Sequence, residues 1–112
     1  MLPKAGRLAK DQEIKQVFVQ GRGFFNPFLA IKYFYKASAS PRFAFVISTK
    51  VSKKAVVRNR LKRVLRELIR REQYKLVPGD YVLILKPKAA LISEAAMLHS
   101  LKELLLKARV YK

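Results

Sequence analysis

Ten basic side chains lie between Lys50 and Arg71, and their charge is the strongest chemical feature of the chain. They are Lys50, Lys53, Lys54, Arg58, Arg60, Lys62, Arg63, Arg66, Arg70 and Arg71. Glu67 is the single acid in this segment. Such a concentration of cations favours binding of a polyanion, because nothing in the segment neutralises most of the charge.

A solvated helix face is the simpler alternative, since basic helices commonly balance their charges with acids at i,i+4. At that spacing Glu67 can reach only Arg63 and Arg71. Four other bases follow one another at i,i+4 without an acid to balance them: Arg58, Lys62, Arg66 and Arg70. Each such like-charge pair destabilises a helix by a few tenths of a kcal/mol. We therefore expect a polyanionic partner to compensate for the repulsion.

The whole chain repeats this imbalance. Its 112 residues include 25 bases and 7 acids, for a net charge of +18, and 51% of them are hydrophobic. That length and hydrophobic content predict a single folded domain, residues 1–112, with a real core. The charge indicates nucleic acid as the first partner class and an anionic membrane as the second.

Few residues suited to protein-centred catalysis are present. There is no cysteine, and His99 is the only histidine, so a zinc site is not expected. The seven acids form no D-x-D or E-x-x-E pair, and neither a Walker loop nor a G-x-S-x-G turn occurs. We expect no catalytic residue, no metal ligand and no small-molecule substrate. The chain is predicted to be a binding protein.

Location follows from the same inventory. The absence of cysteine suits a reducing compartment, and the N-terminal segment lacks an apolar signal core. No run of about eighteen apolar residues is present, so no membrane span is expected. We predict a soluble, cytoplasmic protein.

The basic segment requires a helix to position it. Apolar residues recur through it at helical spacing and fall within an arc of roughly 100°. These residues are Val57, Leu61, Val64, Leu65 and Leu68. Most of the bases lie on the opposite side, with Arg58 and Arg60 at the flanks, and Ser52 is a candidate N-cap. The pattern predicts one buried face and one basic face.

Two more helices are predicted on either side. Ile14, Val17 and Phe18 recur at i, i+3 and i+4 and indicate a short helix between Asp11 and Gly21. Ser93 is positioned to cap a last helix with a regular apolar stripe.

Strands are expected between these helices. Residues 29–35, 43–48 and 81–85 are rich in β-branched and aromatic side chains, and residues 37–41 suit a hairpin loop between the first two strands. The resulting class is α+β, with three helices on a small, mainly antiparallel sheet of three to four strands. The long helix joins two strands of that sheet, and general handedness rules favour a right-handed crossover.

Aromatic residues crowd the first half of the chain. Most belong to the expected core, but an exposed aromatic in a basic groove can stack on unpaired RNA bases. Phe18, Tyr33 and Tyr35 are the candidates.

The segment from Arg58 to Arg66, RNRLKRVLR, resembles the R-N-R-x-K-R-x-x-R signature of the protein subunit of bacterial ribonuclease P. The flanking segments are also similar to that family. They comprise Arg7-Leu8-Ala9-Lys10 with Ile14, Phe18 and Gly21, the strand from Arg42 to Ser48 with Lys50, and Pro78-Gly79-Asp80-Tyr81. The resemblance covers nearly the whole chain.

This resemblance implies an accessory protein for a catalytic RNA that removes the 5′ leader of precursor tRNA. It implies Mg²⁺ held mainly by the RNA subunit and substrate, a 1:1 protein–RNA complex, an αβββαβα order and a left-handed βαβ crossover. Residues that would contact the RNA subunit are Arg58, Asn59, Arg60, Lys62, Arg63, Arg66 and Arg70.

The resemblance also implies a leader-binding cleft lined by the first helix, the sheet and the basic turn. The corresponding residues are Phe18, Ile14, Lys32, Tyr33, Lys50, Lys53 and Lys54. Ile14 stands where the family usually has a second aromatic. Lys32 stands where tyrosine is common, and a one-residue change of register would put Tyr33 there instead.

Other classes share part of this profile. A ribosomal-type structural RNA-binding protein has the same basic, catalysis-poor composition but lacks the R-N-R signature. A stand-alone nuclease would need the acids that are missing here. An amphipathic membrane protein would need a helix whose apolar face is not used by a core.

Overall fold

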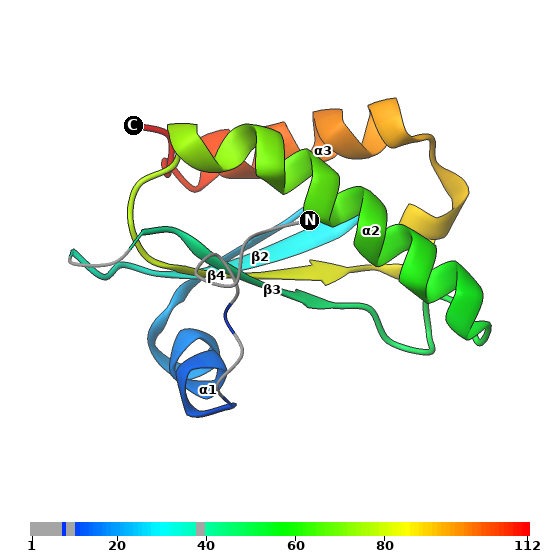
Figure 1. The fold of residues 1–112 in the computed structure, drawn as a ribbon, viewed down its shortest axis with the longest axis horizontal. Helices are drawn as coiled ribbons and strands as arrows, with labels where there is room; N and C mark the ends of the chain where they lie inside the picture. Colours follow the sequence, from blue (N-terminus) through cyan, green and yellow to red (C-terminus); the bar gives the residue numbers. More distant parts are fainter. Residues whose placement is uncertain (1–7, 9–10, 38–39) are drawn as a thin grey trace.

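Helices cover both faces of a four-stranded sheet in the computed structural model, which describes Leu8, residues 11–37 and residues 40–112 (Figure 1). The elements are α1 (Asp11–Gln20), β1 (Arg22–Phe25), β2 (Leu29–Phe34), β3 (Arg42–Val46), α2 (Ala55–Glu72), β4 (Asp80–Leu85) and α3 (Glu94–Lys107). Two 3₁₀ turns, η2 (Gln73–Lys75) and η3 (Pro87–Leu91), flank β4. The predicted α+β class is confirmed. Of the N-terminal motif, Arg7, Ala9 and Lys10 lie outside the described residues.

The strand order is β1-β2-β4-β3. β1 pairs with β2 and β2 with β4 in antiparallel fashion, whereas β3 and β4 are parallel. The sheet is therefore mainly antiparallel, as predicted. The predicted hairpin between the strands expected at residues 29–35 and 43–48 is wrong, because β4 lies between β2 and β3. Residues 38–39 of that connection lie outside the described residues.

α2 joins the parallel strands β3 and β4 as a left-handed crossover (Figure 1). The family resemblance implied this hand, and the general right-handed rule fails here. A right-handed connection would place α2 on the sheet face that α1 covers. With the observed hand, α2 and α3 share one face and α1 covers part of the other.

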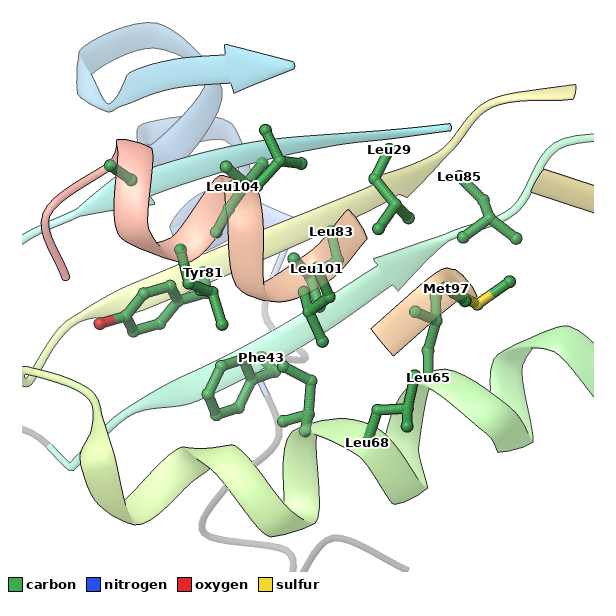
Figure 2. Close-up of a cluster of buried hydrophobic side chains, with 14 of the residues drawn as sticks. Leu29, Phe43, Leu65, Leu68, Tyr81, Leu83, Leu85, Met97, Leu101 and Leu104 are labelled. Carbon is green, nitrogen blue, oxygen red and sulfur yellow. The ribbon is translucent and has the colours of Figure 1, made fainter. Parts of the chain in front are cut away.

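The main core lies between that helix pair and the sheet (Figure 2). Leu65 and Ile69 of α2 and Leu101 of α3 are fully buried against Phe43 and Tyr81 of the sheet. The predicted apolar face of α2 is confirmed at Leu61, Leu65 and Leu68. Val57 and Val64 lie half-buried at its margin, and Ile69 belongs to the core although the predicted arc omitted it.

Sequence reasoning missed β1. Residues 21–28 contain glycine, asparagine and proline, which favour a turn over a strand. In the structure Asn26 makes the turn, since its Oδ1 accepts hydrogen bonds of 2.9 Å from the N–H groups of Phe28 and Leu29. Its amide nitrogen donates to Ser100 Oγ at 2.8 Å, which ties the β1–β2 hairpin to α3.

The two serine N-cap predictions had different outcomes. Ser93 caps α3, because its Oγ accepts a 3.1 Å hydrogen bond from the N–H of Ala96. Ser52 does not cap α2, which starts at Ala55 after Lys54. The Ser52 hydroxyl instead accepts from the N–H of Lys54 at 3.2 Å, inside the preceding turn. Within the described residues, no helix is both long and apolar enough to cross a membrane.

Candidate nucleic-acid interface

Among the described residues, one cross-strand row of the sheet stays partly exposed on the face that carries α1. Residue pairing aligns Phe25, Ala30, Ile84 and Val46 across all four strands, and we call these four residues the open row. Phe25 has 66% of its surface exposed and Val46 has 36%, whereas Ala30 and Ile84 are half-buried. An apolar strip that crosses a sheet at this level of exposure can stack or pack against unpaired bases.

Cationic side chains border the open row. Lys86 Nζ lies 4.4 Å from the centre of the Phe25 ring, in cation–π distance. The half-buried Lys32 follows in the next cross-strand row, where its partners are Gly23 and Val82. The row thus combines apolar surface with positive charge. Phe25, Ile84, Val46 and Lys86 were not predicted as site residues, because only the pairing of distant strands brings them together.

α1 covers the other end of this face. Val17 is fully buried with Leu8 and Val82, and Ile14 packs beside them in a half-buried position. Phe18 is about 100° around the helix from Val17 and exposes 41% of its surface. The predicted site residue Phe18 is therefore accessible, whereas Ile14 mainly fixes the helix to the sheet.

A network of four charged residues holds α1 in place. Asp80 is fully buried and accepts from Arg42 at 2.9 and 3.0 Å and from Lys36 Nζ at 2.8 Å. Glu13 of α1 pairs with the same Arg42 and with Lys36 at 3.2 Å. Two cations therefore bridge the buried Asp80 of β4 to Glu13 of α1.

Electrostatics keep this network ionised. Hydrogen bonding from Arg42, with a smaller contribution from Lys36, lowers the pKa of Glu13 from 4.5 to about 2. The hydrogen bond to Asp80 in turn raises the pKa of Lys36. Both shifts favour the charged forms and so stabilise the docked position of α1 at neutral pH.

The prediction that Tyr33 lines a leader cleft is wrong. Successive strand residues point to opposite faces, and Tyr33 points into the α2–α3 core, where it is only 4% exposed. Its hydroxyl donates to the carbonyl of Pro78 at 2.8 Å, and its ring packs 4.6 Å from that of Tyr81. Lys32, not Tyr33, is on the α1 face. Tyr35 is exposed, beyond the end of β2.

The turn between β3 and α2 presents three predicted site residues. Lys50, Lys53 and Lys54 are all exposed. Val51 anchors the turn, since it is buried in the main core. Because β3 ends at Val46, this basic turn follows directly from the open row (Figure 1).

The basic residues of α2 divide between two flanks of the helix. Arg58, Lys62 and Arg66 follow one another at i,i+4 on one flank, where all three are half-buried, and Arg66 also reaches toward α3. Arg60 and Arg71 are exposed on the other flank, which faces α3. Asn59, Arg63 and Arg70 are exposed between the two flanks.

Three of these arginines have partners within the chain: Arg58, Arg70 and Arg71, the last through a 3.8 Å contact with Glu67. Arg58 donates to the carbonyl oxygen of Ser52 at 2.8 Å and so ties the basic turn to the helix. Arg70 pairs with Glu67 at 2.6 Å. The expectation that Arg70 lacks an acid partner is wrong. Glu67 pairs closely with Arg70 at i,i+3, whereas its i,i+4 neighbour Arg71 lies 3.8 Å away.

No three potential metal ligands converge within the part of the chain that the structure describes. Glu13, Glu67, Glu72 and Asp80 are all engaged with basic side chains. The described residues therefore do not fit a resident Mg²⁺ ion.

The fold and these surfaces define a small basic α+β protein whose exposed cations suit a polyanionic partner. A family model, Ribonuclease P, matches residues 2–109. The chain belongs to the ribonuclease P protein family. Ribonuclease P is a tRNA-processing endoribonuclease and a ribonucleoprotein, so membership implies an RNA partner.

Individual relatives agree with this assignment. The chain is 38% identical to a ribonuclease P protein component of Xylella fastidiosa, over 92% of this chain and 76% of that one. It is 35% identical to that of a Cyanothece species, over 98% and 97% of the two chains. Both relatives span most of the described fold.

Solved structures give the same result for the fold. The RNase P protein from Staphylococcus aureus superimposes with a TM-score of 0.89 at 23% identity, over 97% of this chain and 100% of that one. The protein from Thermotoga maritima, solved with 1-(4-fluorophenyl)-2-thiourea, gives 0.80 at 26% identity, over 88% and 96%.

Proposed function

We propose that this protein binds the RNA subunit of ribonuclease P through α2 and holds the single-stranded 5′ leader of precursor tRNA on the open row. The observation that carries the proposal is the separation of two cation-rich surfaces, one on α2 and one beside the exposed apolar row. A single strand binds where bases can stack next to cations, and a folded RNA binds where cations meet phosphates.

The leader-binding surface comprises Phe18, the open row, Lys32 and the basic turn with Lys50, Lys53 and Lys54. Phe18 and Phe25 offer aromatic surface for stacking, and the lysines supply charge for the phosphates. Ile14 supports this surface from below by fixing α1 to the sheet.

The surface for the RNA subunit comprises seven exposed or half-buried polar residues of α2. They are Arg58, Asn59, Arg60, Lys62, Arg63, Arg66 and Arg70. Mg²⁺ and the catalytic centre belong to the RNA subunit and substrate in this proposal, since the described part of the chain offers no cluster of hard ligands. The protein then acts by increasing affinity for substrate in a 1:1 complex.

Reconstitution tests the proposal. The purified protein is mixed with a bacterial ribonuclease P RNA at low Mg²⁺, and leader removal from precursor tRNA is followed over time. We expect the protein to stimulate cleavage by the RNA and to show no cleavage alone. Absence of stimulation would refute the proposal, and cleavage by the protein alone would place the catalytic centre in this chain.

A further inference from the structure

A groove of about 750 Å³ runs between α2 and α3 on the side of the molecule opposite α1. Its floor is apolar and consists of Val64 and Leu68 from α2 and Leu98 from α3. Leu68 is buried, and the other two are half-buried. This volume is within the range typical of sites that enclose one small ligand.

The rim of this groove is cationic. Four arginines of α2 line it: Arg60, Arg63 and Arg71 are exposed, and Arg66 is half-buried. Within the described residues Arg60 and Arg63 form no ion pair, whereas Arg71 reaches Glu67 at 3.8 Å. Glu94 of α3 is the other acid on the rim, so the arginines retain an excess of positive charge.

An apolar floor beneath a rim of arginines suits a flat ring with apolar faces that is joined to an anion. An unpaired nucleotide has both parts. Its base can pack on aliphatic side chains, and its phosphate can accept hydrogen bonds from guanidinium groups. A paired base could not enter the groove, because its faces are stacked on neighbouring bases within the RNA duplex.

We propose that the α2–α3 groove receives one unpaired nucleotide of the RNA subunit, with its base on Val64 and Leu98 and its phosphate between Arg60 and Arg63. This inference rests on the proposed function, which places the RNA subunit on α2. The RNA subunit is the favoured source because the sheet separates the groove from the open row. A leader strand on the open row would have to pass around the sheet to reach it.

Two matched substitutions test the groove. Ala95 is exposed and lines it, so Ala95→Trp fills the groove without changing charge. Ala96 is equally exposed but lines a separate hollow beside Asn26 and His99, so Ala96→Trp is the control. Both changes place the same side chain near the start of α3 and have similar intrinsic effects on the helix. Affinity for the RNA subunit is measured by filter binding, and folding by thermal melting.

We expect Ala95→Trp to weaken binding of the RNA subunit about tenfold, the scale of one lost base contact, while Ala96→Trp stays within about twofold of wild type. Wild-type affinity of Ala95→Trp would overturn the inference. If Ala95→Trp lowers the melting temperature, the inference is tested with Arg60→Gln instead. That variant should weaken binding and reduce the log–log salt slope by about one, and an unchanged slope would overturn the inference.

Two further readouts identify a different occupant. If Ala95→Trp weakens only precursor tRNA binding by the holoenzyme, the leader occupies the groove and the assignment to the RNA subunit is wrong. If sedimentation shows a wild-type dimer that Ala95→Trp dissociates, the groove is a contact between copies of the protein. Failure of the wild-type protein to bind the RNA subunit would instead refute the proposed function.

Discussion

The ion network around Asp80 should respond very differently to the loss of either of its two acids. Asp80 is fully buried and accepts three hydrogen bonds, from Arg42 and Lys36. Glu13 has a side chain that is 23% exposed and shares the same two cations. We expect Asp80→Asn to destabilise the whole fold, whereas Glu13→Gln should mainly loosen α1.

The burial of each acid determines how much unfolding free energy its substitution removes. Removing one partner of a buried ion pair costs about 3–5 kcal/mol, and this range applies to Asp80→Asn. Exposed pairs contribute at most about 1 kcal/mol, so the partly exposed Glu13 should contribute about 1–2 kcal/mol. For a domain of this size, 1 kcal/mol corresponds to about 4 °C in melting temperature. The expected decreases are therefore about 12–20 °C for Asp80→Asn and about 4–8 °C for Glu13→Gln.

Acid titration provides a second measurement. Because the pKa of Glu13 is lowered from 4.5 to about 2, its contribution to stability is complete above pH 4.5 and disappears as the pH falls toward 2. The difference in unfolding free energy between wild type and Glu13→Gln should narrow over that interval. A constant difference, or equal destabilisation by both variants at neutral pH, would refute this account of the network.

Three further variants test individual contacts. Phe18→Ala should weaken precursor tRNA binding by about 1–3 kcal/mol with little effect on mature tRNA or melting temperature, since Phe18 is 41% exposed; equal loss for both tRNAs would exclude leader stacking. Tyr33→Phe should lower the unfolding free energy by about 1 kcal/mol through loss of the bond to Pro78 and leave leader binding unchanged; a leader-specific loss would contradict the buried position. Alanine at Arg58, Arg63 or Arg66 should reduce the log–log salt slope of RNA binding by up to about one for each substitution. Only Arg58→Ala should also lower the melting temperature, because Arg58 alone of the three donates to Ser52, and equal melting temperatures for all three variants would contradict this.

Local patterns in the sequence predicted the helices well. The period of Leu61, Leu65 and Leu68 identifies the buried face of α2, and Ser93 marks the start of α3. The strand order could not be predicted in the same way. It depends on β4 inserting between β2 and β3, which is a choice between distant segments that no local pattern records.

The sequence could predict only those parts of the candidate site whose residues are close together along the chain. The basic face of α2 and the basic turn follow from neighbouring residues. The open row does not, because its four members come from four strands. Asp80 follows Pro78-Gly79, a pair typical of turns, and its partners Glu13, Lys36 and Arg42 lie elsewhere in the chain. The confusion between Lys32 and Tyr33 has a similar cause, since only the packing of the sheet decides which residue of the alternating pair is buried.

The spacing of the two arginines in the R-N-R motif acquires a physical reason from the structure. Residues two apart on a helix differ by about 200°, so Arg58 and Arg60 must lie on opposite flanks of α2. Arg58 holds the basic turn next to the open row through Ser52, and Arg60 lines the groove beside α3. In the proposed function, Arg60 serves only the surface for the RNA subunit, whereas Arg58 belongs to that surface and also holds the basic turn of the leader-binding surface in place. Because of this division, Arg58→Lys should affect precursor tRNA more than the RNA subunit, whereas Arg60→Lys should do the reverse.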